Sequence, residues 1–141
     1  MSLTNKYERD TLDAMFGDNS ITGSTHHVGL VKLGGVIAED GTVADEVTGG
    51  DYARVEIANN ITNWPAATTD GSDETSKKNG EDIEFPEATA DWGEITHFFI
   101  ATSASGTGDD VIGYGSILVP REIKTGDIAR FKSEELAITL D

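Results

Sequence analysis

The spacing of apolar residues changes along the chain from a helical period to a period of two. Residues 3–17 place apolar side chains at helical spacing, which predicts one helix. Asn5 and Glu8 resemble a capping box near its start, and Gly17 is typical of the position after a helix end. The apolar stripe of this helix consists of Tyr7, Leu12, Met15 and Phe16.

Beyond residue 20 the pattern is that of short strands with one buried face. Arg54 and Glu56 alternate with apolar residues in the segment Ala53–Ile57, which places both on the polar face of a strand. The turn residues Thr125-Gly126-Asp127 predict a short hairpin between residues 121–124 and 128–131. Further strands are predicted at His26–Leu33, closed by Gly34-Gly35, and at Leu136–Leu140.

Two more predicted strands, Glu94–Ala101 and Val111–Val119, are apolar on both faces. Regular alternation places Ile95 and Phe99 on one face of the first strand, opposite Phe98. Strands of this kind need cover on both sides. We expect a facing sheet on one side, and the helix or a neighbouring subunit on the other.

Residues 66–84 form a long polar segment without an apolar period, which predicts a surface loop or a segment ordered by a partner. About eight short strands with turn signals between them indicate a mainly β fold. We expect an antiparallel β-sandwich of jelly-roll-like form with one N-terminal α-helix. The helix and its arm would occupy residues 1–20, and the sandwich domain residues 21–141.

The charge of the chain limits the class of partner. Twenty-six acidic and ten basic residues among 141 give a net charge of −16. Such a charge repels nucleic acid and anionic lipid, so neither nucleic acid nor a membrane is an expected partner. The chain has no cysteine, begins with a polar segment, and lacks an apolar run of about 20 residues, the length of a membrane span. These features predict a soluble protein made in a cytoplasm.

The segment FPEATADWGEITHFFI brings Asp91, Glu94 and His97 close together in sequence, as in a catalytic site. General acid–base catalysis requires such groups to meet in a cleft. His97 lies in the middle of a predicted strand, whereas Asp91 and Glu94 precede it beside Gly93, where acidic side chains often bind the backbone of a turn. We therefore interpret the segment as the start of a strand, with Trp92 as a buried anchor.

Patterns for metals and nucleophiles are weak. His26 and His27 are adjacent, so in a strand their rings point to opposite faces and one zinc ion cannot bind both. Neither a nucleophile elbow nor a phosphate-binding loop is present. The acidic residues in the polar segment lack the pattern of a calcium loop, although a weakly bound divalent ion between subunits stays open. These acidic residues are Asp70, Asp73, Glu74, Glu81 and Asp82. We expect no catalytic, cofactor-binding or metal-binding residues, and no enzyme.

Short motifs are spread over nearly the whole chain: Leu3-Thr4-Asn5, Leu12 with Phe16-Gly17, Val28-Gly29-Leu30, Gly50-Asp51-Tyr52-Ala53-Arg54-Val55, Asn60 to Ala66, Phe85 to Phe98, Gly113-Tyr114-Gly115, Gly126-Asp127 with Arg130-Phe131, and Leu136 with Leu140-Asp141. Together they resemble a family of small structural proteins of tailed bacteriophages. These proteins are usually labelled tail fibre protein, and some relatives are head-associated. The chain departs from the family after Leu30, where residues 31–35 replace a polar, proline-containing loop. None of the motifs implies a catalytic role.

The resemblance implies a non-enzymatic structural protein of the virion. A fibre needs length, and the sequence shows no coiled-coil, collagen-like or β-helical shaft. We therefore favour a head decoration (cement) protein that binds and stabilises the capsid lattice. The expected partners are further copies of the chain in a homotrimer, and the major capsid protein or another virion protein. The expected location is the virion, on the head surface rather than the tail, after synthesis in the host cytoplasm.

Two alternatives stay open. The first is a tail fibre or tail-tip-associated structural protein. The second is a carbohydrate-binding β-sandwich in which Trp64, Trp92, Tyr52 and Tyr114 stack on sugars, which requires these side chains to be exposed. The residues predicted for an oligomer or partner interface are Tyr7, Leu12, Met15, Phe16, Phe98, Ile100, Ile112, Tyr114 and Leu118.

Overall fold

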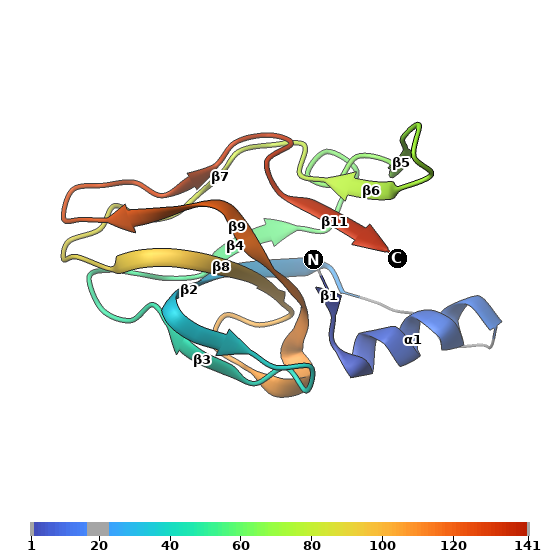
Figure 1. Cartoon of the computed structure of the whole chain (residues 1–141), viewed down its shortest axis with the longest axis horizontal. Helices are drawn as coiled ribbons and strands as arrows, with labels where there is room; N and C mark the ends of the chain where they lie inside the picture. Colours follow the sequence, from blue (N-terminus) through green and yellow to red (C-terminus); the bar gives the residue numbers. More distant parts are fainter. Residues whose placement is uncertain (1, 17–22, 141) are drawn as a thin grey trace.

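The computed structural model describes residues 2–16 and 23–140, and it shows a mainly β protein with one N-terminal helix (Figure 1). The predicted fold class is confirmed, with antiparallel sheets that pack against each other. Helix α1 spans Asn5–Phe16, and a 3-10 helix, η1, spans Gly108–Asp110. The strands are β1 (Ser2–Leu3), β2 (Thr25–Ile37), β3 (Val43–Glu46), β4 (Val55–Ala58), β5 (Thr68–Thr69), β6 (Thr75–Lys78), β7 (Ile83–Glu84), β8 (Gly93–Ala101), β9 (Val111–Ile123), β10 (Arg130–Phe131) and β11 (Ala137–Leu140).

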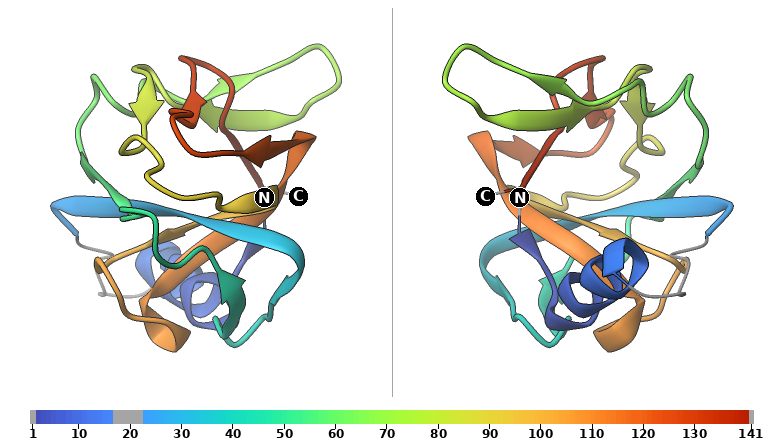
Figure 2. Two further views of the ribbon diagram at one scale, coloured as in Figure 1. Left: turned by 90° about the vertical axis from the view of Figure 1, so that its left-hand side faces the viewer. Right: turned by 90° about the vertical axis from the view of Figure 1, so that its right-hand side faces the viewer.

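A six-stranded sheet forms the body of the described part of the chain. Its order is β1-β9-β8-β2-β3, and β4 also pairs with β2. Two smaller sheets, β10-β7 and β11-β6-β5, lie on one side of it, and α1 lies on the other side (Figure 2). The two strands predicted to be apolar on both faces are β8 and β9, and β8 pairs with β2 and β9 on its two edges.

Side chains from the two faces of the large sheet form two apolar clusters. The larger cluster includes residues of the large sheet and of the smaller sheets, among them Phe98, Ile100, Phe85 and Phe131. The smaller cluster consists of Val31, Ile37, Phe99, Ala101 and Val111. Strand β8 is therefore buried on both faces, as its sequence predicts.

A bulge interrupts the pairing of β8 with β9. Ile95 pairs with Arg121, but the next pair is His97 with Ser116, so residues 117–120 of β9 lie opposite a single residue of β8. Extra residues in one strand bend that strand and interrupt its hydrogen bonds with the partner strand. Leu118 lies in this bulge, and 98% of its surface is exposed.

A second register shift, between β8 and β2, changes the orientation of Ile95, because two steps along β8, from Ile95 to His97, match one step along β2. This side chain is buried in the larger cluster with Phe98 and Ile100, whereas Phe99 is buried in the smaller cluster. The expectation that Ile95 and Phe99 share a face is therefore wrong, because regular alternation does not continue through a bulge.

Strand β2 continues through the glycine pair that was expected to end it. Its pairing with β3 shifts register between Val31 and Val36, and Gly34 has a φ of 86°. Glycine adopts this left-handed region without a steric penalty. The two glycines therefore mark an irregularity within a strand and not its end.

The polar segment 66–84 is not only a surface loop, and its ordering by a partner stays a prediction. It contains β5, β6 and β7, and β6 pairs with both β5 and the last strand, β11. The carboxylate of Asp70 forms the turn after β5, because it accepts hydrogen bonds from the backbone N–H groups of Ser72 and Glu74 at 2.7 and 3.1 Å. Sequence periodicity missed β6 because all four of its residues, Thr75–Lys78, are polar.

The hairpin predicted between residues 121 and 131 is also wrong, although its turn is present. The N–H of Asp127 donates to the carbonyl of Lys124, and the N–H of Lys124 donates to the carboxylate of Asp127, both at 2.9 Å. Beyond this turn β10 pairs with β7 and not with β9. The turn therefore takes the chain from the large sheet to a smaller one.

Helix α1 is attached to the large sheet through the residue before it. The buried Thr4 donates its hydroxyl to the carbonyl of Val111 at 2.8 Å and its N–H to the carbonyl of Ile112 at 3.0 Å. Asn5 is already the first helical residue, so the predicted capping box, which needs Asn5 outside the helix, is wrong.

Part of the predicted arm lies outside the described residues. Gly17, the expected helix stop, belongs to this part, as do the side chains of Leu12, Met15 and Phe16. The division into an arm at residues 1–20 and a sandwich at residues 21–141 stays a prediction. Among the described residues, no helix is long and apolar enough to cross a membrane.

The ring of Phe99, on β8, lies over Gly29 of the neighbouring strand β2, where no side chain fills the space. Gly29 is its cross-strand partner, and a Cβ atom at Gly29 would lie 2.3 Å from Cζ of the buried Phe99 ring. The guanidinium of Arg54 lies over the same ring, with 4.7 Å between Cζ of Arg54 and the ring centroid. A glycine at position 29 is therefore required for the ring to occupy this place.

We expect Gly29→Ala to destabilise the fold by about 1–3 kcal/mol, because the added methyl group overpacks a buried ring. Gly71→Ala is the matched control, since a Cβ atom at Gly71 would meet nothing within 4 Å. Urea unfolding of both variants measures the difference. Equal free energies of unfolding for the two variants would show that Phe99 has room to move.

Candidate functional site

The segment that resembles a catalytic site forms a turn and a strand start, as the sequence predicts. Asp91 accepts hydrogen bonds from the backbone N–H and the hydroxyl of Thr125 at 2.8 and 3.1 Å, and these bonds hold the pKa of Asp91 below its usual value. Nδ1 of the half-buried His97 lies 2.9 Å from the hydroxyl of the adjacent Thr96. Glu94 is exposed. Asp91 and His97 thus have threonines as their polar partners, and neither is bonded to the other or to Glu94.

The histidine pair on β2 is divided between two environments. The ring of His26 lies beside Trp64, with 6.2 Å between ring centroids, and His27 is buried. Burial lowers the pKa of His26, and the neighbouring His27 lowers it further. Among residues 2–16 and 23–140, no three His, Cys, Asp or Glu side chains are placed to hold a metal ion.

Two of the acidic residues in the polar segment have structural contacts. Asp70 forms the turn after β5, and the carboxylate of Asp82 accepts a hydrogen bond from the N–H of Ser133 at 2.8 Å. The side chain of Asp82 also lies 3.7 Å from Nη1 of Arg130. The contacts of Asp82 join the segment to other parts of the same chain, whereas those of Asp70 lie within it.

The tryptophans suggested for sugar stacking are buried. Trp64 and Trp92 have 4% and 3% of their surface exposed. Nε1 of Trp92 donates to the carbonyl of Gly50 at 3.0 Å, so the prediction that Trp92 is a buried anchor is confirmed. Buried rings offer no face to a sugar, and the two tryptophans therefore do not support the carbohydrate-binding alternative.

The two tyrosines of that alternative are also engaged within the chain. Tyr52 packs edge-on against Trp92, with ring centroids 5.4 Å apart. Tyr114 is half-buried, and its hydroxyl donates to the carboxylate of Glu39. This hydrogen bond, together with burial, raises the pKa of Tyr114 to about 12.

The residues predicted for an oligomer or partner interface differ in exposure. Phe98 and Ile100 are buried in the core of the chain itself. Leu118 is almost fully exposed, whereas the half-buried members of the set are Tyr7, Ile112 and Tyr114. The interface stays a prediction, and among the members whose side chains the structure describes Leu118 is the most exposed.

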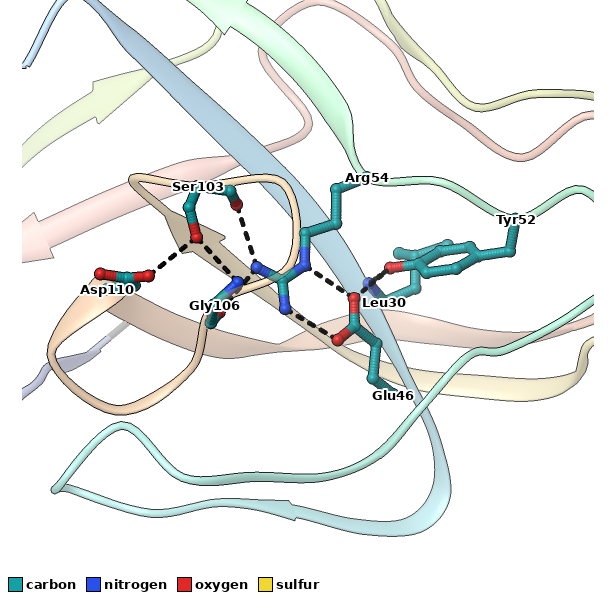
Figure 3. Close-up of polar contacts among 7 residues, drawn as sticks. All are labelled: Leu30, Glu46, Tyr52, Arg54, Ser103, Gly106 and Asp110. Carbon is teal, nitrogen blue, oxygen red and sulfur yellow. Dashed lines mark hydrogen bonds and ion pairs between the residues drawn. The ribbon is translucent and has the colours of Figure 1, made fainter.

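A buried ion pair that sequence reasoning missed joins β3 to the segment before β4 (Figure 3). The side chain of Arg54 is 1% exposed, and its Nε and Nη2 donate to the two carboxylate oxygens of Glu46, both at 2.8 Å. Glu46 also accepts a hydrogen bond from the hydroxyl of Tyr52 at 3.0 Å, and this hydroxyl accepts one from the N–H of Leu30 at 2.9 Å. Burial raises the pKa of Tyr52, and the charge of Glu46 raises it further, so the hydroxyl stays protonated.

Arg54 also fixes the loop between β8 and β9 (Figure 3). Its Nη1 donates to the carbonyls of Ser103 and Gly106 at 3.0 and 2.8 Å. The hydroxyl of Ser103 closes the loop, because it donates to the carboxylate of Asp110 at 2.9 Å and accepts from the N–H of Gly106 at 2.8 Å. All three guanidinium nitrogens therefore donate hydrogen bonds to groups of the same chain.

The structure corrects the expectation that Arg54 lies on the polar face of a strand. Strand β4 begins at Val55, so the alternation within β4 does not set the direction of Arg54. Buried arginine is tolerated where a carboxylate and carbonyl oxygens accept its hydrogen bonds. Glu46 lies eight positions before Arg54, and no local pattern indicates that the two side chains meet.

We expect Arg54→Met to lower the free energy of unfolding by about 3 kcal/mol or more, because it leaves Glu46 and two carbonyls without their donor. Methionine keeps an unbranched apolar side chain and removes the guanidinium. Arg130→Met is the comparison variant, since Arg130 is 45% exposed and its contacts with Asp82 and Glu84 lie at the surface. Such pairs contribute about 0–1 kcal/mol.

Urea unfolding of both variants, each against the unsubstituted protein, measures these two values. A loss for Arg54→Met no larger than that for Arg130→Met would contradict a central role for the buried pair.

Comparison with known proteins agrees with a structural role. A family model described as Podophage GP4 fiber I protein gp80 matches residues 2–139, from β1 into β11. The search of curated proteins found no match. The match includes the residues of the buried Arg54 network, the bulge at Leu118 and the three sheets.

Proposed function

The chain belongs to the family of podophage fibre I proteins, and we propose that it is a structural subunit of a fibre on the phage tail. The single observation that carries this proposal is the family match over residues 2–139. A structural role in the virion follows from the family itself. The match favours the tail-fibre alternative over the head decoration function that we favoured from the sequence.

The shape of the domain supports a particular place in such a fibre. Strands β1 and β11 lie side by side (Figure 1), so the two ends of the described chain meet at one position. Within the described residues, α1 is the one α-helix, and the sheets form a globular body. A chain arranged in this way adds a globular unit and little length. We therefore propose a globular module of the fibre and not its shaft.

The partners proposed for this module are further copies of the chain, as a homotrimer, and neighbouring virion proteins. Each chain has a net charge of −16, so copies repel each other and their contacts need apolar surface. Leu118 supplies such surface, because the bulge in β9 exposes it.

The location on the virion can be tested on particles of the phage that encodes this chain. We expect an antibody against the chain, detected by immunogold electron microscopy, to bind at the tail fibres. An antibody against the major capsid protein serves as the control that marks the head. Gold from the first antibody spread over the head lattice would overturn the tail proposal and favour head decoration.

For the trimer, we expect the purified protein to sediment with three times the 15.0 kDa mass of one chain, and Leu118→Ser to shift it toward the mass of one chain. Serine removes apolar surface without disturbing the core, because Leu118 is outside it. Ile128→Ser is the control, since Ile128 is a second exposed apolar residue and lies outside β9, in the segment before β10. If the unsubstituted protein sediments as a monomer, the trimer is refuted. If Leu118→Ser and Ile128→Ser sediment with the same mass, the interface does not depend on Leu118.

A further inference from the structure

The outer face of the three-stranded sheet β11-β6-β5 carries a hollow of about 350 Å³. Ile138 packs against the larger apolar cluster and pairs with Lys77, so this side of the sheet faces inward. Neighbouring residues along a strand point to opposite faces, so Ser76 and Lys78 face outward. The hollow is lined by Pro65, Ala66, Thr68, Ser76, Lys78, Gly80, Ser133 and Glu134.

The buried side chain of Asn79 joins the end of β6 to the turn that carries Ser133. Asn79 is 1% exposed, and its Oδ1 accepts the N–H of Leu136 at 2.8 Å. Its Nδ2 donates to the carbonyls of Glu81 and Lys132 at 2.8 and 2.9 Å. The hydroxyl of Ser133 donates to the carbonyl of Gly80 at 2.8 Å. The turn that carries Ser133 and the end of β6 therefore form one rigid wall.

The opposite wall is fixed as tightly. The N–H of Gly80 donates to the carbonyl of Asn63 at 2.8 Å, and Nζ of Lys77 donates to the carbonyl of Pro65 at 2.9 Å. A Cβ atom at Gly80 would lie 2.2 Å from the carbonyl oxygen of Thr62 and 2.8 Å from Cγ of Pro65. The segment 62–65 therefore packs directly on Gly80, and contacts within the chain fix this wall of the hollow.

Glu134, at the edge of the hollow, has an unusual backbone conformation. Its φ is 70°, a left-handed value that glycine and asparagine normally occupy. Its N–H donates to the carbonyl of Asn79 at 2.8 Å, which holds it there. Strained residues are concentrated at binding sites, and here the strained residue is one of those that line the hollow.

We propose that this hollow binds a neutral saccharide. The hydroxyls of Thr68 and Ser76 donate and accept hydrogen bonds, Lys78 donates, and Glu134 accepts. A sugar hydroxyl can pair with each of these groups. Pro65 and Ala66 offer a small apolar surface to the C–H groups of a sugar ring. The volume lies within the range of small-molecule sites, at about 300–1,000 Å³.

The charges of the hollow and of the whole chain favour a neutral ligand over an anionic or a cationic one. Lys78 and Glu134 make the hollow itself neutral, whereas the chain as a whole has a net charge of −16. An anionic sugar would be repelled by the chain, and a cation would meet Lys78. A neutral, hydroxyl-rich ligand satisfies the donors and acceptors without either conflict. The inference rests on the hollow alone and does not depend on the assignment to a fibre.

The test is nitrogen–proton correlation NMR of the whole labelled protein, titrated with four probes: the methyl glycosides of glucose, galactose and mannose, and N-acetylglucosamine. We expect at least one probe to shift the amide signals of Thr68, Ser76, Lys78 and Glu134 saturably, with the millimolar affinity usual for a small polar ligand. N-acetylneuraminic acid, an anionic sugar, should bind more weakly than that probe.

Lys78→Met should weaken the binding at least tenfold, because it removes a charged donor from an exposed position without touching the core. Lys124→Met is the matched control, since Lys124 is exposed on the turn between β9 and β10. The proposal fails if no neutral probe gives saturable shifts, if the shifts map to another surface, or if Lys78→Met binds as tightly as Lys124→Met.

Discussion

The described fold depends on a guanidinium that must find acceptors inside the protein. Removing a charged group from water costs several kcal/mol unless it is paired and hydrogen-bonded. The acceptors of Arg54 come from Glu46 and from the carbonyls of Ser103 and Gly106. Strand β3, the entry to β4 and the loop after β8 must therefore take their positions together. The same guanidinium covers the Phe99 ring, which lies over Gly29, so the ion pair and the smaller apolar cluster stabilise each other.

The position of the N-terminal helix follows from this network. Asp110 closes the loop that Arg54 holds, and the next residue, Val111, accepts the hydroxyl of Thr4 directly before α1. The loop is also held from its outer side, where the N–H of Gly108 donates to the carbonyl of Gly41 at 2.9 Å. The helix thus begins at a point that is fixed by backbone contacts, independent of the side chains along its length. This explains how a helix of 12 residues, which is marginal alone in water, can be part of the fold.

Sequence periodicity identified most of the strands that bury apolar residues, but it missed β7, whose Ile83 is buried in the larger cluster. Strands β2, β4, β8, β9 and β11 contain apolar residues that reach a core, and each was predicted near its observed place. Strands β5 and β6 are made of Thr, Ser and Lys, so no apolar pattern marks them. The face assigned to Ile95 is wrong because β8 has an extra residue opposite β2. The hollow could not be predicted, because its residues come from three segments that only the pairing of β6 with β5 and β11 brings together.

The bulge in β9 has two consequences for assembly that belong together. Strand β1 covers the outer edge of β9 only at Gly113 and Tyr114, so among the described strands none pairs with the rest of that edge. An open edge invites the addition of further strands without limit. Pro120 has no N–H to donate, and the bulge bends the strand, so backbone pairing there is blocked. The same bulge exposes Leu118, which can contact a partner through its side chain. In the proposed trimer, this favours a closed association over open-ended growth, because a side-chain contact needs one matching surface, whereas a free strand edge accepts any strand.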